Sequence, residues 1–137
     1  MTHELTILAL AGLLQAVQFA LMAIPANLEL GMGKTASPRD PDRMGGKTML
    51  KLLSTKIARL ARVMNNHFEA LILFTLAVVV IELSGQNTQF TAACAIAYII
   101  ARILYIPAYY FGWTPWRSVI WFIGFGATIA MIVSTLF

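Results

Sequence analysis

The chain has little charge and almost no cysteine. Only 12% of its 137 residues are charged and 59% are hydrophobic, and its mean hydropathy is +0.76. A soluble domain carries roughly twice that share of charged residues, so the composition favours a membrane protein. A single cysteine, Cys94, excludes an intrachain disulfide and the clustered cysteines of a zinc site. No glycine-rich nucleotide-binding motif is present either.

The sequence contains four long apolar segments with almost no charged residues. Residues 5–24 carry no charge, and their length matches the roughly 30 Å of a bilayer's hydrocarbon at about 1.5 Å per residue. With no basic residues before it, this segment is predicted to be a retained span rather than a signal peptide. The sequence therefore predicts an all-α integral membrane protein, a four-transmembrane-helix bundle forming one domain over residues 1–137. The expected spans are 5–24, 64–83, 91–106 and 118–137. The loop 25–62 separates the first two, and Pro25 at its start is expected to end the first helix. The other two loops contain "SGQNTQ" and "FGWTPWR".

The basic residues predict an orientation. Residues 25–62 hold eight of the ten lysines and arginines, and only Arg102 and Arg117 lie elsewhere. Cytoplasmic loops carry such an excess, so we expect the first and third loops in the cytoplasm and both termini on the other side. This also explains the basic pI without nucleic acid, because the loop lacks the interleaved aromatic residues that stack on bases.

The second helix is expected to begin well before its span. One apolar stripe steps by three and four residues through Leu50, Leu53, Ile57, Leu60 and Met64. The pattern predicts a helix from near Lys47 to Leu83, long enough to project several turns into the cytoplasm.

Polar residues gather on one face at the entry to the second span. On a helix, Arg59, Arg62, Asn66 and Glu69 fall within about 80° of one another. An ionisable group at the depth of Glu69 is a functional-site hypothesis by default. The alternative is an ion pair between Glu69 and an arginine that only locks helices together.

The end of the third span repeats this arrangement. Arg102, Tyr105 and Tyr109 share one face, and Arg117 opens the fourth span. Because the second span begins on the side where the third ends, both polar faces are expected at one membrane level. The tyrosines could instead be interfacial anchors. Guanidinium groups suit carboxylates, a glutamate suits an ammonium group, and an arginine near a thiol favours its thiolate, so a small peptide with two carboxylates fits.

Other polar residues of the spans are expected to be structural. Gln15 and Gln18 are predicted to form hydrogen bonds between helices. His67 lies off the polar face and no second histidine is near it in the sequence, so we expect no metal or haem site.

Two motifs carry a resemblance to a known family. "RLARVMNNHFE" resembles the second-helix signature of the MAPEG family, the membrane-associated proteins in eicosanoid and glutathione metabolism. In that signature an arginine, an asparagine and a glutamate recur with the spacing of Arg62, Asn66 and Glu69. "ARILYIPAYYFGWTPWRSVIWF" resembles the junction of the third and fourth spans, matching at Arg102, Tyr105, Tyr109 and Arg117. Within the family, the chain resembles prokaryotic-type microsomal glutathione transferases.

The resemblance implies a homotrimer that binds glutathione between subunits near the cytoplasmic side. It implies that glutathione is held by Arg59, Arg62, Asn66, Glu69, Arg102, Tyr105 and Tyr109. It also implies that Arg117 stabilises the thiolate, with Ser118 as a second thiol partner. A lipophilic co-substrate would arrive from the bilayer, among the lipids.

The sequence leaves three functions open. The eicosanoid-forming branch has a basic residue near the cytoplasmic end of span one, whereas here the first basic residue is Lys34, which leaves a general glutathione transferase or peroxidase. The alternative is a non-catalytic scaffold or partner subunit with the same fold. A small transporter that uses Glu69 as its coupling acid is disfavoured, because Glu69 lies near one end of its span rather than at the midplane.

Overall fold

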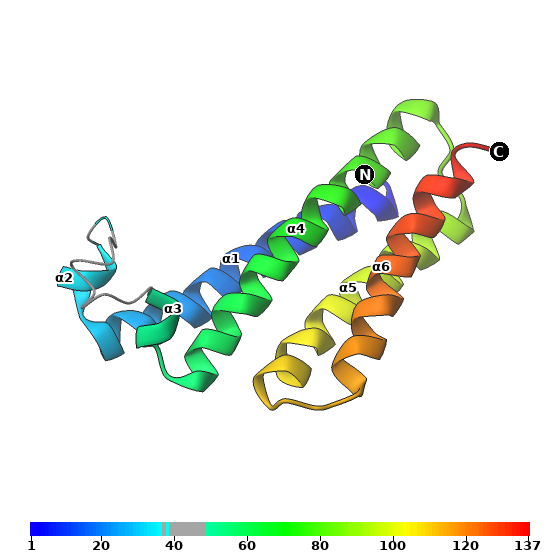
Figure 1. Ribbon diagram of the computed structural model, residues 1–137. Helices are drawn as coiled ribbons and strands as arrows, with labels where there is room; N and C mark the ends of the chain where they lie inside the picture. Colours follow the sequence, from blue (N-terminus) through cyan, green and yellow to red (C-terminus); the bar gives the residue numbers. More distant parts are fainter. Residues whose placement is uncertain (37, 39–48) are drawn as a thin grey trace.

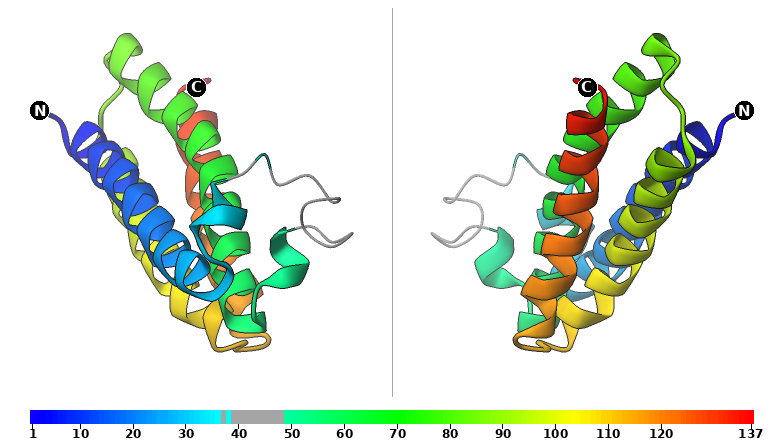
Figure 2. Two further views of the ribbon diagram at one scale, coloured as in Figure 1. Left: turned by 90° about the vertical axis from the view of Figure 1, so that its left-hand side faces the viewer. Right: turned by 90° about the vertical axis from the view of Figure 1, so that its right-hand side faces the viewer.

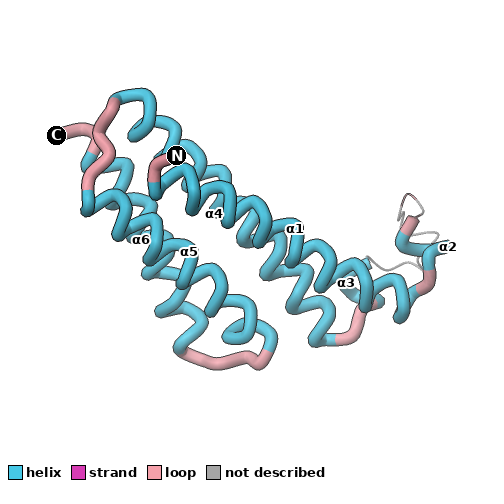
Figure 3. Tube along the Cα trace, turned by 180° about the vertical axis from the view of Figure 1, so that it is seen from behind, coloured by secondary structure: helices cyan, strands magenta, loops and turns pink. Residues whose placement is uncertain are grey.

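The structure is a computed structural model, which describes residues 1–36, 38 and 49–137, and helix accounts for most of them (Figures 1 and 3). Four helices are long: α1 (His3–Leu30), α4 (Thr55–Ser84), α5 (Gln89–Tyr110) and α6 (Trp116–Ser134). Two are short: α2 (Met32–Thr35) and α3 (Met49–Leu52). Within these described ranges there is no strand, so the predicted all-α fold is confirmed.

All four long helices have the length and composition to cross a membrane. Large apolar side chains cover the outside of the bundle, among them Leu13, Phe19, Ile72 and Phe122, which are each more than half exposed. Such a surface would face lipid rather than water. The chain therefore fits an integral multi-pass membrane protein, as the composition predicts. Each helix also extends by one or more residues beyond at least one end of its predicted span.

The long helices run up and down as two pairs (Figures 1 and 2). α1 packs chiefly against α4, and α5 against α6. Both termini lie at the end of the bundle that carries the turn between α4 and α5 (Figure 1). The beginning of α4 and the turn between α5 and α6 lie at the opposite end (Figure 1). The topology thus brings the two polar motifs to one end, as their order along the chain predicts.

Small and aromatic residues form the core between the pairs. Ala11, Ala77 and Ala95 are fully buried, and such small residues let membrane helices approach closely. Against them the rings of Phe74 and Tyr98 stack with centroids 3.9 Å apart. This packing holds α4 against α5. It lies a few turns from the end of the bundle that carries the two polar motifs, which we call the polar end.

Side-chain hydrogen bonds tie the helices together at the end that carries the termini. The buried carboxylate of Glu4 in α1 accepts hydrogen bonds from the Thr91 hydroxyl and from Asn87 Nδ2, the latter at 3.1 Å. Thr91 also forms a capping box with Thr88 at the start of α5. α1 is therefore attached to the beginning of α5 although the two are far apart in sequence.

Pro25 does not end the first helix, so that prediction is wrong. α1 continues through Pro25 to Leu30. A proline removes one backbone donor, but a membrane helix tolerates this where its surroundings hold the turn in place. Here the flanking Met22 and Ala26 are buried against Ala58 and Ala61 of α4.

The second long helix begins at Thr55 rather than near Lys47, which itself lies outside the described residues. α3 ends at Leu52, and Ser54 has extended backbone with ψ 157°. The Ser54 N–H donates to the Glu29 carboxylate at the end of α1. The predicted continuous helix is wrong because this contact takes the amide that an uninterrupted helix would use.

Candidate functional site

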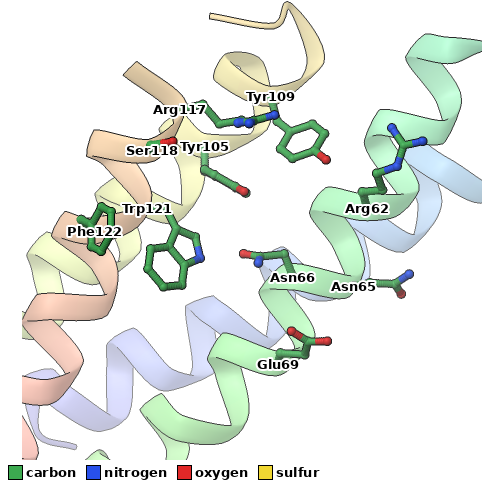
Figure 4. Close-up of a pocket in the computed structure, with 10 residues that line it drawn as sticks. All are labelled: Arg62, Asn65, Asn66, Glu69, Tyr105, Tyr109, Arg117, Ser118, Trp121 and Phe122. Atoms are coloured by element: carbon green, nitrogen blue, oxygen red, sulfur yellow. The ribbon is translucent and has the colours of Figure 1, made fainter. Parts of the chain in front are cut away.

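A groove with a volume of about 490 Å³ opens at the polar end of the bundle, between α4 and the pair α5 and α6 (Figure 4). α4 contributes Arg62, Asn65, Asn66 and Glu69, α5 contributes Tyr105 and Tyr109, and α6 contributes Arg117, Ser118, Trp121 and Phe122. Polar and charged groups line most of it. Residues of both sequence motifs therefore meet in one site.

The α4 wall follows from helical periodicity. Arg62, Asn66 and Glu69 recur at the spacing of one helix face, whereas Ala61 and Val63 on the other side are buried. Arg62 and Glu69 are exposed and Asn66 is half-buried. Figure 4 shows these side chains on the side of α4 that faces the groove. No ion pair joins Glu69 to an arginine within the described residues, so the simple helix-locking alternative lacks its contact.

The α5 and α6 wall is built from aromatic rings and one guanidinium group. Tyr105 is buried and meets Tyr109 edge to face, with ring centroids 5.7 Å apart. The guanidinium carbon of Arg117 lies 4.8 Å from the centroid of the Tyr109 ring. A cation over an aromatic face is attracted by it, so Tyr109 holds Arg117 in place without neutralising its charge.

Arg102 lies behind the groove rather than in its lining. Its side chain is only 2% exposed, and its Nη2 donates a 2.8 Å hydrogen bond to Asn66 Oδ1. Its guanidinium carbon also lies 4.9 Å from the centroid of the Tyr105 ring. Arg102 therefore fixes Asn66 and Tyr105, two residues of the lining, and faces a smaller neighbouring pocket.

Arg59 is also absent from the lining of the groove. Its Nη1 donates a 3.0 Å hydrogen bond to the carbonyl oxygen of Tyr110, the last residue of α5. Gly112, with φ 68°, lies so near that a Cβ there would be 3.3 Å from Arg59 Nη1. In the structure Arg59 thus joins α4 to the end of α5.

Three residues of the lining were not predicted: Asn65, Trp121 and Phe122. Asn65 is a neighbour of Asn66 and lies at the edge of the same face. Trp121 and Phe122 follow Ser118 by three and four residues, so helical spacing from Ser118 could have indicated them.

The other predicted structural residues have mixed outcomes. His67 is fully buried, and its Nδ1 lies 2.7 Å from Gln15 Oε1, while Gln15 Nε2 donates to Met64 O at 3.3 Å. The prediction for Gln15 is confirmed. For Gln18 it is wrong, because its buried amide has no hydrogen-bond partner among the described residues. No group of three potential metal ligands occurs in the described part of the chain.

The groove is suited to a small zwitterionic or anionic ligand. Two guanidinium groups, one carboxylate and several neutral donors surround it. Guanidinium groups bind carboxylates in a two-pronged geometry, and the carboxylate of Glu69 can receive an ammonium group. A model of the MAPEG family matches residues 7–137, nearly the whole chain.

The chain belongs to the MAPEG family. This family includes glutathione transferases and peroxidases as well as non-catalytic members, and its members use glutathione. No individually curated protein matches the chain. Membership in the MAPEG family confirms the resemblance that the two motifs carry and agrees with the bundle of four long helices.

Proposed function

We propose that this MAPEG protein is a membrane glutathione transferase or peroxidase that acts on lipophilic electrophiles or hydroperoxides. The observation that carries the proposal is the groove, which combines two guanidinium groups, a carboxylate and a hydroxyl at one end of the bundle. A scaffold needs no such cluster of exposed polar groups beside apolar helices.

The charges of glutathione match those of the groove. The tripeptide has two carboxylates and one ammonium group, and Arg62 can bind a carboxylate while Glu69 binds the ammonium group. The half-buried amide of Asn66 can bind the peptide backbone, and its orientation is fixed by Arg102. Tyr105 and Tyr109 supply hydroxyl groups and an aromatic wall. We assign Arg59 and Arg102 to positioning rather than to contact with glutathione.

Arg117 is the residue that we expect to activate the thiol. A guanidinium group beside a thiol favours the thiolate, which is the nucleophile. Arg117 stacks on Tyr109 and has no carboxylate partner among the described residues, so its charge is available to the sulfur. Ser118 follows it in the lining and can donate a second hydrogen bond.

The lipophilic substrate would meet the thiolate at the α6 side of the groove. Trp121 and Phe122 line the groove there, and Phe122 is also 64% exposed on the outside of the bundle.

In a transfer, the sulfur bonds to an electrophilic carbon and the leaving group departs with its electron pair. In a peroxide reduction, the sulfur attacks the terminal oxygen and breaks the O–O bond, giving an alcohol and a sulfenic acid. A second glutathione then reduces the sulfenic acid, giving a disulfide and water.

A homotrimer and a cytoplasmic position of the groove belong to the same proposal. The basic residues of the first loop support the orientation. Large apolar side chains of α4, including Phe68, Ile72 and Leu76, remain more than half exposed and could pack against a second copy. A groove between subunits would exclude water from glutathione on its open side.

The test is ultraviolet difference absorbance of the thiolate band, measured on detergent-solubilised protein titrated with glutathione. The wild type is expected to give a saturable thiolate signal. Arg117→Ala is expected to lose that signal while calorimetry still detects glutathione, and Arg117→Lys should retain part of it. Glutathione binding without a thiolate signal in the wild type would refute activation. The absence of both would favour the scaffold.

A further inference from the structure

A second pocket lies beside the groove, deeper along the helices. It has a volume of about 160 Å³, and it shares Asn66, Glu69 and Trp121 with the groove. Ala70 and Leu73 of α4 and Phe125 of α6 give it apolar walls. At about 30 Å³ per water molecule, this volume corresponds to about five waters. It is large enough for a small polar group and the first part of an apolar body.

Two deeply buried side chains in its lining each have one polar atom without a partner. Tyr98 is 1% exposed and Arg102 is 2% exposed, and both line this pocket. Neither Tyr98 Oη nor Arg102 Nε has a hydrogen-bond partner among the described residues. Buried polar atoms are nearly always hydrogen-bonded, so these donors in the wall of a cavity are available to a ligand that brings acceptors.

The charge of Arg102 indicates what that ligand is. Arg102 lies eight residues before the end of α5, about 12 Å along the helix and inside the apolar part of the bundle. Its polar contacts are with the neutral Asn66 and Tyr105. Glu69 is the one carboxylate in the lining of this pocket, and no ion pair joins it to Arg102 in the described part of the chain. A buried cation without a counterion is expensive in a membrane, so an anion would stabilise it.

We propose that the second pocket binds the carboxylate of an acidic lipophile, with Arg102 as its counterion and Tyr98 as a further hydrogen-bond donor. A carboxylate fits the planar fork of a guanidinium group, and the apolar walls suit the carbons next to it. Phe125 is 42% exposed on the outside of the bundle, so the rest of the apolar body would leave along α6 toward the lipid.

The site is distinct from the glutathione groove but adjoins it at Asn66, Glu69 and Trp121. That the acidic lipophile is also the acceptor of the glutathione reaction rests on the function proposed above. Its binding at Arg102 does not rest on that function.

Bromine quenching of Trp121 tests the site. Trp113→Phe and Trp116→Phe leave Trp121 as the only tryptophan of the chain. In nonionic detergent, 2-bromodecanoate is expected to quench its fluorescence at a concentration about tenfold lower than 2-bromodecan-1-ol does, and unbrominated decanoate should reverse the quenching. A charged hydrogen bond commonly contributes such a factor.

Two variants separate the charge from the shape of the pocket. Arg102→Met, which keeps the length of the side chain, is expected to remove the preference for the acid. Gly124→Ala adds a methyl group to the lining, where its neighbours would be Ala101 Cβ at 3.4 Å and Arg102 Cδ at 3.7 Å, and should weaken quenching by the acid. Gly126→Ala on the same helix meets nothing within 4 Å and is the matched control.

Glutathione calorimetry on the same proteins separates this proposal from the previous one. Acid-selective quenching in a wild type that does not bind glutathione would support the second pocket and refute the function proposed for the groove. Equal quenching by the acid and the alcohol would overturn the carboxylate site, as would unchanged selectivity in Arg102→Met. Weaker quenching by the acid in Gly124→Ala, with Gly126→Ala unaffected, would support it even if Arg102→Met fails to fold.

Discussion

The hydrogen bond between Arg102 and Asn66 can be tested by a double-mutant cycle without any ligand. Asn66→Ala removes the acceptor of the 2.8 Å bond and leaves Arg102 Nη2 without its partner. Because Arg102 Nε is already unpaired and the side chain is 2% exposed, the variant adds a second unpaired donor to a buried cation. A hydrogen bond to a charged group contributes about 1.5–3 kcal/mol, so Asn66→Ala is expected to destabilise the protein by about that amount.

The adjacent asparagine provides the control. Asn65 is exposed, lines the groove and has no hydrogen bond to the described residues, so Asn65→Ala should change the free energy of unfolding by less than about 0.5 kcal/mol. Reversible unfolding in mixed detergent micelles measures both variants. In the double variant with Arg102→Met, the cost should be smaller than the sum of the single costs by about 1 kcal/mol or more. Additive costs would refute the coupling between α4 and α5 through this bond.

Two further predictions concern buried polar groups and the turn between α5 and α6. Gln15→Leu removes the hydrogen bond to His67 and should destabilise the protein by about 1–2 kcal/mol, whereas Gln18→Leu, which removes an unpaired buried amide, should be neutral or stabilising. Thermal unfolding monitored by circular dichroism distinguishes them, and equal effects would contradict the assigned contacts. Gly112→Ala imposes a side chain at φ 68° next to Arg59 and should cost about 1–3 kcal/mol in the same assay. A neutral result would contradict the packing of Arg59 against this turn.

The sequence predicted the general architecture because membrane helices follow from composition and length. Four apolar segments with uneven basic residues define a bundle with few alternatives, since a lipid-exposed backbone must form helices or closed barrels. The ends of helices depend on contacts that a sequence does not display. Pro25 is a residue that usually ends a helix, yet α1 continues through it because the neighbouring residues are buried. The second helix is interrupted at Ser54, whose N–H donates to Glu29, a residue far from it in sequence.

The candidate site was predicted in outline for a similar reason. Helical spacing identifies which residues share a face, so Arg62, Asn66 and Glu69 were found together. Spacing does not say what lies opposite that face. Arg59 and Arg102 belong to the same stripes as the lining residues, but tertiary contacts with Tyr110 and Asn66 take them out of the groove.

The arginines near the polar end have different roles, which depend on how deeply each is buried and on what it contacts. Arg59 donates a hydrogen bond to the carbonyl oxygen of Tyr110, one of the last carbonyl groups of α5. Arg117 lies on the ring of Tyr109 with its charge available to the groove. Arg102 is deepest, and its single hydrogen bond to a neutral amide leaves a full charge in an apolar setting. Stability alone would favour an apolar residue of similar volume at that position, because a buried charge costs more than packing recovers. In the proposal made above, that charge is balanced by the carboxylate of a ligand in the second pocket, so Arg102 serves binding rather than folding.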